Sequence, residues 1–509
     1  MALWRVLRDA ASRFPDRIAV TAGGRDYTYA DLDDRVERVA AGLRFQSLGP
    51  SDRVVTVLGN SIEHLTLLLG CFRASLVAVP LAPWTPAVHI RYVLRTSVAR
   101  GFVASPAMLE TVLEGQDDLR PDVTITIGDP NPPHRILPWE IVEAGPSDPP
   151  DPPDPRRDHL ALIVYSSGTT SRPKGVVHTQ ERLALRVASF TKEIQLTESD
   201  VALVVQQLSR PLPLFGQVLA SFQVGGRVVL HEGQAKGFWE TYQAEPRATF
   251  VVAIPALTRE LLANPAAATA DHSKLRLWLS GGDAVSAALQ TKFQLTTGRD
   301  LIEICGMTEA GFYAMNPASG PARIGSIGRP LEGIQVRLID PMGNEVGPDE
   351  VGEILLETPG VMVGYWNDTA ETFRVLRNGW LHTGDLARRD ADGFLWLAGR
   401  LRDMINRGGR KIAPPMVEAA LGEHPAVLQA VVVGAPDVEC GQVPFAFLML
   451  RPGAVLPTDV EWSHWLADKL ELAAIPVGYA TVEEWPLTYQ GKLDRARLVW
   501  MAENGGAPV

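Results

Sequence analysis

A cluster of small, hydroxyl-bearing and basic residues lies between positions 165 and 175. It reads Tyr165-Ser-Ser-Gly-Thr-Thr-Ser-Arg-Pro-Lys-Gly175 and follows an apolar run, residues 160–164, typical of a buried strand. Small residues let the backbone approach a polyphosphate, hydroxyl and amide groups donate to it, and a lysine adds positive charge. The order is not that of a Walker A loop, and a Ser/Thr-rich turn is the alternative. We predict a phosphate-binding loop with contacts at Ser166, Ser167, Gly168, Thr169, Thr170 and Lys174.

Further short motifs follow along the chain. They are Gly281-Gly-Asp283, Cys305-Gly-Met-Thr-Glu309, Gly325-Ser-Ile-Gly-Arg-Pro330, Gly364-Tyr-Trp-Asn367, Trp380-Leu-His-Thr-Gly-Asp385, Gly399-Arg-Leu-Arg-Asp403 and Pro486-Leu-Thr-Tyr-Gln-Gly-Lys492. With the first cluster, these motifs resemble in type and order those of the adenylate-forming (ANL) superfamily, which includes acyl-CoA synthetases, peptide-synthetase adenylation domains and luciferases. The resemblance covers the whole chain. It implies an acid–thiol ligase that activates a carboxylic acid with ATP as an acyl-adenylate and transfers the acyl group to coenzyme A.

The resemblance also implies roles around the nucleotide. Thr308 would bond an α-phosphate oxygen, and Glu309 would hold Mg²⁺, a hard cation that prefers carboxylate and phosphate oxygens. Asp385 would accept both ribose hydroxyls, and Arg400 would contact the ribose or a phosphate. A Thr-Glu pair alone is also a helix-capping feature, a Gly-Asp pair is a common turn, and Arg400 could be a solvated charge. The other implied adenylate-binding residues are Gly282, Asp283, Cys305, Gly306 and Met307.

Lys492 is the candidate catalytic cation of the adenylation step. Attack of a carboxylate on the α-phosphate brings two negative groups together, and a cation positioned only at that step stabilises the transition state. The resemblance places a hinge at Arg402 and implies that the small domain after it rotates once the adenylate has formed. Gly408 and Gly409 would then line the channel for the pantetheine arm of coenzyme A. Arg407, Arg410 and Lys411 could bind its phosphates, or form a solvated charged loop.

Three positions depart from the pattern of the superfamily. Ser171 replaces a glycine of the phosphate loop, where a positive φ would strain a side chain. Cys305 replaces a tyrosine expected against adenine and removes an aromatic stacking face. In the acyl pocket, implied at Phe215, Gly216 and Gly281, glycine stands at 216 where many members have histidine or an aromatic residue. We expect this loss of bulk to enlarge the pocket for a bulky acyl group.

Four functions remain to be compared. The first is an acyl-CoA ligase for a bulky carboxylic acid. The second is a ligase impaired in adenylation by Ser171 and Cys305, which mainly forms the thioester from an acyl-adenylate made by a separate enzyme. The third is a stand-alone adenylation enzyme that loads a carrier protein, and the fourth is a non-catalytic protein that binds a nucleotide or acid. Lys492, Asp385 and Glu309 favour catalysis, and the pair Gly408–Gly409 favours coenzyme A as acceptor.

Short apolar runs that alternate with helical patterns position these residues. Runs at 53–58, 160–165 and 228–230 alternate with helices such as 29–43, which predicts an α/β fold with parallel-type sheets covered by helices. Residues 65–81 predict a buried helix followed by a buried strand, and residues 1–14 an amphipathic helix. Short strands at 334–339, 352–357 and 394–397 predict a small β-rich subdomain. We place an N-terminal domain at 1–401, a mobile α+β C-terminal domain at 402–509, and a polyproline-like connector at 146–155.

Composition narrows the partners. The 509 residues are 46% apolar, and the net charge of −11 argues against duplex nucleic acid or anionic membrane as the main partner. No apolar run is long enough to span a bilayer. Three widely spaced cysteines show no metal-ligand spacing and indicate a reducing, cytoplasmic compartment. The resemblance to the adenylate-forming superfamily implies a small-molecule acid, ATP and coenzyme A as the partners, and the sequence leaves a homodimer open.

The assignment of Lys492 yields a separable outcome for the two half-reactions. Lys492→Ala should abolish formation of the acyl-adenylate, because the cation acts only while pyrophosphate leaves. The same variant should still form the thioester when acyl-adenylate is supplied. Assays of each half-reaction check this expectation, and unchanged adenylation would remove the role assigned to Lys492.

Overall fold

The computed structural model describes residues 1–116, 119, 121–129, 131–133, 135–146, 154–166, 173–233, 235–283, 285–319, 322–488 and 492–504. Contacts within the chain divide it into two compact units. The first unit joins Met1–Gln335 with Leu356–Leu381, and the second joins Val336–Leu355 with His382–Val509. The expected connector at 146–155 lies mostly outside the described residues.

Two large sheets form the frame of the first unit. Within the described residues, one sheet has nine strands in the order β16-β15-β14-β13-β12-β10-β11-β1-β2, and the other has eight in the order β19-β9-β8-β4-β3-β5-β6-β7. The strands of the first are β1 (Ile18–Ala22), β2 (Arg25–Thr28), β10 (Val201–Val204), β11 (Arg227–Leu230), β12 (Phe250–Ala253), β13 (Leu277–Gly281), β14 (Leu301–Met307), β15 (Gly311–Met315) and β16 (Arg329–Pro330). Those of the second are β3 (Arg53–Val57), β4 (Val77–Leu81), β5 (Gly101–Ala104), β6 (Val123–Thr126), β7 (Ile136–Pro138), β8 (Leu160–Ser166), β9 (Lys174–Thr179) and β19 (Gly364–Tyr365).

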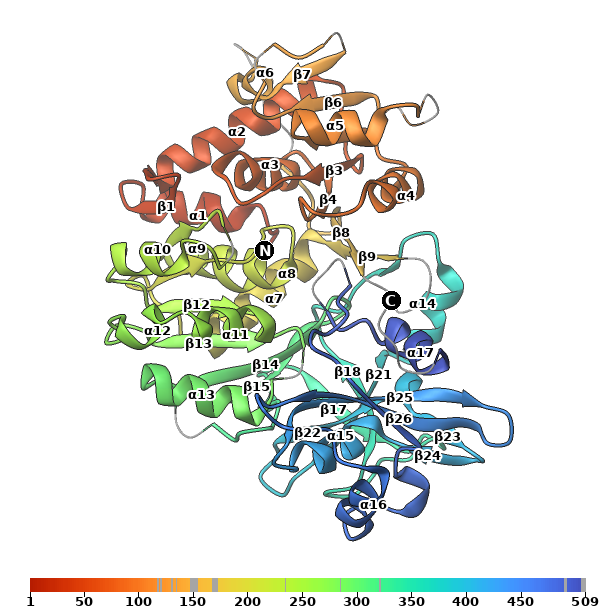
Figure 1. Ribbon diagram of the computed structural model, residues 1–509. Coiled ribbons are helices and arrows are strands. Elements are labelled where there is room, and N and C mark those ends of the chain that lie inside the picture. The colour runs from red at the N-terminus through yellow and green to blue at the C-terminus, as the bar shows by residue number, and fades with distance from the viewer. Residues whose placement is uncertain are drawn as a thin grey trace. The chain divides into compact units, whose positions relative to one another are not determined.

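Helices cover both faces of each sheet in this unit, which gives alternating helical and sheet layers (Figure 1). The middle layer, between the sheets, contains α1 (Arg5–Arg13), α2 (Tyr29–Phe45), α3 (Ile62–Arg73), α6 (Trp139–Ala144), α7 (Gln180–Glu193), α8 (Pro211–Pro213), the π-helix η1 (Leu214–Leu219) and α9 (Ala220–Val224). The outer helices are α4 (Ala87–Ser97) and α5 (Pro106–Leu113) on one sheet, and α10 (Phe238–Ala244), α11 (Pro255–Ala263), α12 (Ala266–Thr269) and α13 (Ala287–Thr297) on the other. A further helix, α14 (Thr369–Val375), follows β19.

The second unit is built on two smaller sheets. One contains most of β17 (Gln335–Ile339), β18 (Gly352–Glu357) and β21 (Trp380–Arg389) and all of β22 (Leu395–Arg400), while β20 (Leu376–Arg377), which pairs with Trp380 and Leu381 at the start of β21, belongs to the first unit. The other contains β23 (Ile405–Arg407), β24 (Arg410–Ile412), β25 (Val427–Asp437), β26 (Gly441–Leu450) and β27 (Gly478–Thr481). The remaining elements are η2 (Leu401–Asp403), α15 (Pro414–Gly422), α16 (Asp459–Ala467), η3 (Leu472–Ala474) and α17 (Arg495–Glu503). Helices α15 and α16 pack on one face of the second sheet, and α17 packs on the other.

The predicted α/β fold is confirmed, and so are its main details. Buried apolar runs became the parallel strands β3 and β4, whose residues are covered on both faces. The predicted helix and strand at 65–81 are α3 and β4, the N-terminal helix is α1, and the short strands of the β-rich region are β17, β18 and β22. The division of the chain into domains at Arg402 stays a prediction.

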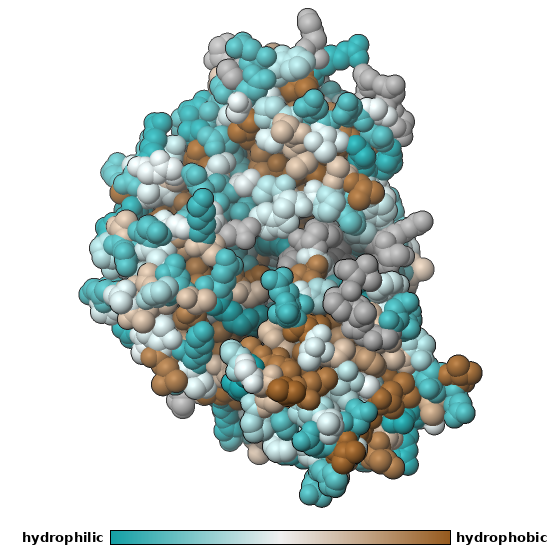
Figure 2. Space-filling model, in the orientation of Figure 1, coloured by the Kyte–Doolittle hydropathy of each residue, from teal (hydrophilic) through white to brown (hydrophobic). Residues whose placement is uncertain are grey.

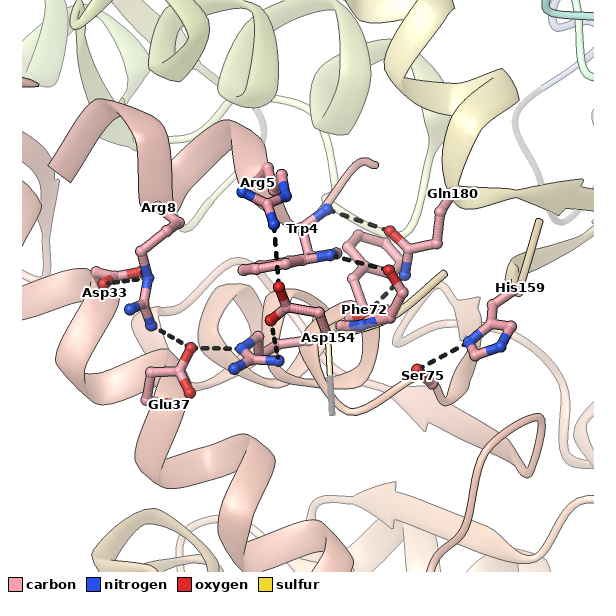
Figure 3. Close-up of polar contacts among 12 residues, drawn as sticks. Trp4, Arg5, Arg8, Asp33, Glu37, Phe72, Ser75, Asp154, His159 and Gln180 are labelled. Carbon is pink, nitrogen blue, oxygen red and sulfur yellow. Dashed lines mark hydrogen bonds and ion pairs between the residues drawn. The ribbon is translucent and has the colours of Figure 1, made fainter. Parts of the chain in front are cut away.

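The N-terminal segment is tied to the two ends of the phosphate-loop region (Figure 3). The Trp4 backbone N–H donates to Gln180 Oε1 at 3.2 Å, and the Trp4 ring N–H donates to the Pro155 carbonyl at 3.4 Å. Asp154 accepts from Arg5 at 3.0 Å, and the guanidinium of Arg73 stacks 4.5 Å from the Trp4 ring. Pro155 leads into β8 and Gln180 begins α7, so Trp4 fixes both segments that flank the phosphate loop.

The visible surface of this unit mixes hydrophilic and weakly apolar residues over α10 to α12 (Figure 2). Large exposed apolar side chains also occur in the second unit, where Val438 between β25 and β26 is fully exposed. No helix in the described part of the chain combines the length and apolar character that a membrane crossing requires.

Candidate active site

Thr308 and Glu309 lie in the tight turn between β14 and β15. These two strands pair antiparallel, with Met307 opposite Gly311, so the motif from Cys305 to Glu309 ends a strand and forms a hairpin. The helix-capping alternative therefore does not apply here. Both side chains are partly exposed, as residues that meet a ligand must be.

Two arginines of α7 hold the backbone of this turn. Arg186 donates to the carbonyls of Thr308, Glu309 and Gly360 at 3.2, 2.8 and 2.6 Å. Arg182, one turn earlier, donates to the carbonyls of residues 361 and 362, and the N–H of Met362 donates to the Glu309 carbonyl at 2.6 Å. Burial lowers the pKa of Arg186 to about 9, and attraction to Glu309 partly opposes that shift. The guanidinium is still charged at neutral pH and fixes the turn.

The segment after Gly364 places two polar side chains beside predicted ligands of the nucleotide. Tyr365 donates its hydroxyl hydrogen to Glu309 Oε1 at 2.8 Å, and burial first of all raises the pKa of this hydroxyl above its ordinary range. Glu371 of α14 accepts from Lys174 at 2.5 Å, and its two oxygens also accept from Arg374. The hydrogen bond from Arg374, with further contributions from Lys174, lowers the pKa of Glu371 to about 2. Glu309 thus lies at the hydroxyl of Tyr365, and Lys174 lies over its ring.

The donor set around Glu309 fits Mg²⁺. No group of three or more histidine, cysteine or acidic side chains that could hold a metal was found in the described part of the chain. Mg²⁺ differs from zinc in needing no such cage, because it is commonly bound by one or two carboxylates together with substrate phosphates. The Tyr365 hydroxyl occupies one of about four lone-pair positions of the carboxylate and leaves the others for a metal. Glu309 would hold the ion, and Mg²⁺ would neutralise phosphate charge.

Most of the predicted phosphate loop lies outside the described residues. This holds for Ser167, Gly168, Thr169, Thr170 and the departure at Ser171. Ser166 ends β8 and Lys174 begins β9, which pairs antiparallel with β8 in the register Ser166 opposite Lys174. The strands on both sides of the loop are therefore held together at its base.

The space beside Gly216 contains an aromatic ring. A side-chain carbon at Gly216 would lie 3.1 Å from the ring of Phe312 and 3.3 Å from that of Phe190. The two rings are tilted by 40° with centroids 4.5 Å apart, and the ring of Phe312 would also lie 3.0 Å from a side-chain carbon at Gly306. The volume that glycine leaves at 216 is thus filled by Phe312 from β15. Phe215, the neighbour of Gly216, is buried in η1.

Gly281 and Cys305 lie on the adjacent strands β13 and β14, and β14 in turn pairs with β15, which carries Phe312. A side-chain carbon at Gly281 would be 2.1 Å from the Ile304 carbonyl, so only glycine lets β13 approach β14 there. Gly282 follows with φ +87°, and Asp283 attracts Arg259 of α11. Cys305 donates through its sulfur to the hydroxyl of Tyr313 at 3.1 Å. Tyr313 is fully buried, so its ring does not replace the missing stacking face.

In the second unit, Asp385 and Arg400 face each other across β21 and β22. They are register partners, and Arg400 Nε lies 2.8 Å from Asp385 Oδ1. Burial raises the pKa of Asp385, and the charges of Arg400 and Arg402 partly oppose this shift. Arg402 lies in η2, 3.5 Å from Asp403. Three residues that the resemblance assigned separately therefore form one charged group.

Gly408 and Gly409 form the turn of the hairpin between β23 and β24. Both have positive φ, +55° and +88°, and Gly408 donates to the Cys440 carbonyl at 2.8 Å. Arg407 donates to the Ala473 carbonyl at 2.8 Å, and Arg410 lies 3.3 Å from Glu471, while Lys411 is exposed. A two-residue turn with positive φ at both positions favours glycine for conformational reasons alone. The turn itself therefore accounts for both glycines.

Lys492 is exposed and lies three residues before α17 begins. The Thr488 N–H donates to the Lys492 carbonyl at 2.7 Å, and the Lys492 N–H donates back to the Thr488 hydroxyl at 3.3 Å. These paired bonds fix the backbone on both sides of residues 489–491.

Comparisons with known proteins identify the family of this chain. Residues 7–366 match the family of AMP-binding enzymes, and residues 416–492 match the AMP-binding enzyme C-terminal domain. The chain is 34% identical to a feruloyl-CoA synthase of Amycolatopsis sp, over 96% of each chain, and 30% identical to an oxalate–CoA ligase of Arabidopsis thaliana, also over 96% of each. A solved anthranilate CoA ligase in complex with anthranoyl-AMP superposes with a TM-score of 0.89 at 26% identity, over 100% of this chain and 98% of that one.

The chain therefore belongs to the AMP-binding, adenylate-forming enzymes, and within them to the acyl-CoA synthetases. It is an acid–thiol ligase that uses ATP and coenzyme A through an adenylate intermediate.

Several site residues were not assigned from the sequence. Tyr365 stood in a recognised motif without a role, and Glu371 follows it by six positions. Arg182 and Arg186 are four residues apart and therefore share one face of α7, but the contacts of that face come only from the packing of the helix. Phe312 gave no signal in the sequence either, because its fit against Gly216 arises only from the packing of β15 on η1.

Glu303 on β14 gives this region a pH dependence. Its Oε1 accepts from the Val285 N–H at 3.4 Å, its Oε2 has no partner within the described residues, and burial raises its pKa from 4.5 to about 8. Between pH 4.5 and 8, the folded protein keeps a proton here that the unfolded chain releases, so stability falls as pH rises. As the pH rises through this window, Glu303→Gln should therefore become more stable relative to the wild type, by at most about 1.4 kcal/mol in the free energy of unfolding per pH unit.

Unfolding measured from pH 5 to pH 8 checks this expectation. Glu110→Gln is the matched control, because Glu110 is exposed on α5. Parallel pH profiles of wild type and Glu303→Gln would contradict it.

Proposed function

We propose that this enzyme converts an apolar, aromatic carboxylic acid to its coenzyme A thioester and performs both half-reactions itself. The observation that carries the proposal is the aromatic wall formed by Phe312 and Phe190 against Gly216, beside Gly306 of the nucleotide motif. A planar acyl group can stack on such a wall, and edge or offset contacts between rings contribute about 0.5–1.5 kcal/mol beyond burial. Because Phe312 fills the space left by Gly216, the acid we propose is smaller than the bulky one expected from the sequence for an enlarged pocket.

The names of relatives do not by themselves define the acid. One relative is a feruloyl-CoA synthase and another an oxalate–CoA ligase, which differ in both size and polarity. The solved anthranilate CoA ligase shows that this fold accepts a one-ring aromatic acid. The wall at Phe312 supports the aromatic choice for this chain.

The charged groups support adenylation by this chain itself. Lys174 and Glu309 are held beside Tyr365, and Asp385 is paired with Arg400. This arrangement favours an active first half-reaction over a chain that depends on a separate adenylating enzyme. We further propose that the part of the chain after Arg402 rotates between half-reactions, so that Lys492 leaves and the Gly408–Gly409 turn serves coenzyme A.

Isotope exchange between pyrophosphate and ATP tests the first half-reaction. With one-ring aromatic acids, Mg²⁺ and no coenzyme A, we expect exchange at least about 100-fold above an acid-free control, because the reversible step forms an enzyme-held adenylate. Lys492→Ala is the negative control. Absence of exchange with every acid, together with thioester formation from supplied acyl-adenylates, would favour the thioester-only alternative.

Phe312 should set the size of the acid. Phe312→Leu removes ring volume from the wall and should raise kcat/KM for two-ring acids relative to one-ring acids by about tenfold, the scale of discrimination by small changes in an apolar pocket. Steady-state assays on paired acids measure this ratio.

Phe222→Leu is the matched control for this substitution. Phe222 is a fully buried ring of the same core, and it packs on Tyr29 and not on Gly216. A ratio that stays at the wild-type value in Phe312→Leu, or that moves equally in both variants, would refute the role of Phe312.

A further inference from the structure

Tyr365 lies beside two predicted nucleotide-binding residues of the first unit, Lys174 and Glu309. It belongs to β19, which pairs antiparallel with β9 in the register Tyr365 opposite Val176. Strand β9 begins at Lys174, directly after the predicted phosphate loop. The short strand therefore carries its side chains to the base of that loop.

The Tyr365 side chain makes two contacts with residues of opposite charge. Its hydroxyl donates to Glu309 Oε1 at 2.8 Å, and the ammonium of Lys174 lies 5.3 Å from the centre of its ring. A cation over an aromatic face and a carboxylate at a phenol hydroxyl are both favourable. One side chain thus contacts the predicted magnesium carboxylate and the predicted phosphate lysine.

Hydrogen bonds hold the backbone of Tyr365 and of the next residue, Trp366, in place. Its own N–H donates to the Thr372 hydroxyl at 2.8 Å, and the next N–H, that of Trp366, donates to the Gly175 carbonyl at 2.7 Å. The Trp366 ring N–H donates to the Thr96 carbonyl at 3.0 Å. Tyr365 therefore has little freedom to follow a displaced carboxylate.

The neighbouring helix completes the arrangement around Lys174. The Asp368 side chain accepts from the Glu371 N–H at 3.0 Å and caps α14. Glu371 then accepts from Lys174 at 2.5 Å, while Arg374 bonds both of its oxygens. The ammonium is held by a carboxylate on one side and an aromatic face on another.

We propose that Tyr365 is a positioning residue for adenylation. Its hydroxyl orients the Glu309 carboxylate toward Mg²⁺, and its ring, with Glu371, keeps Lys174 directed to the polyphosphate. Because the hydroxyl donates to a single oxygen of Glu309, it sets the angle of the carboxylate while leaving lone pairs for the metal. The inference rests on the proposed role of Glu309 in metal binding.

Binding of α,β-methylene-ATP, a non-reacting analogue, tests the proposal without turnover. Calorimetry with and without Mg²⁺ gives the gain in affinity due to the metal for the wild type and each variant. Tyr365→Phe keeps the ring but loses the hydroxyl. The factor by which Mg²⁺ tightens binding should therefore fall about tenfold, while the Kd measured without Mg²⁺ stays unchanged. Tyr365→Leu should also weaken metal-free binding about threefold, because Lys174 loses the ring.

Two further variants make the outcomes distinguishable. Glu309→Gln should lose most of the gain due to the metal, and Tyr29→Phe should match the wild type although it loses a buried hydroxyl bond, to the Gly226 carbonyl at 2.5 Å. If Glu309→Gln loses the gain and Tyr365→Phe keeps it, the proposal for Tyr365 is wrong and Glu309 stands. If Glu309→Gln keeps the gain, the metal role of Glu309 fails and the proposal fails with it. Equal loss with and without Mg²⁺ in Tyr365→Phe would show a structural role only.

Discussion

A guanidinium that donates to main-chain carbonyls holds the turn on which the nucleotide site of the first unit depends. Arg186 bonds the carbonyls of Thr308, Glu309 and Gly360. Partial burial of the Arg186 guanidinium is costly unless each of its N–H donors finds an acceptor. The three carbonyls that accept from it are therefore held in place together with the arginine. The directions of the Thr308 and Glu309 side chains follow from a backbone that cannot shift independently of α7.

This constraint connects elements far apart in the sequence. Helix α7 follows β9 directly, and β9 begins at Lys174 beside the predicted phosphate loop. The same helix fixes the β14–β15 turn through Arg186 and residues 361 and 362 through Arg182. Strand β19 then returns to β9 and brings Tyr365 to Glu309. A substitution on α7 would therefore act on metal and phosphate ligands together, although neither arginine belongs to a recognised motif.

Much of the fold and part of the site could be predicted from the sequence. Buried strands such as β4 and helices such as α3 follow from local apolar patterns, and the motifs give positions such as Lys174 and Glu309 in chain order. Contacts that depend on packing could not be predicted. The filling of the space at Gly216 by Phe312 requires knowledge of how β15 lies on η1, and the pairing of Asp385 with Arg400 requires the register of two strands.

Trp4 has a consequence for the order in which the chain can fold during synthesis. Its two hydrogen-bond partners, Pro155 and Gln180, are 151 and 176 residues later in the chain. Ribosomes add residues one at a time, and contacts of such long separation form late and slowly. These two hydrogen bonds of Trp4 therefore cannot both form until the start of α7 has emerged. During that interval, the indole lacks the hydrogen bonds that fix it to the segments flanking the phosphate loop, and it presents apolar surface to the chaperones that meet a nascent chain.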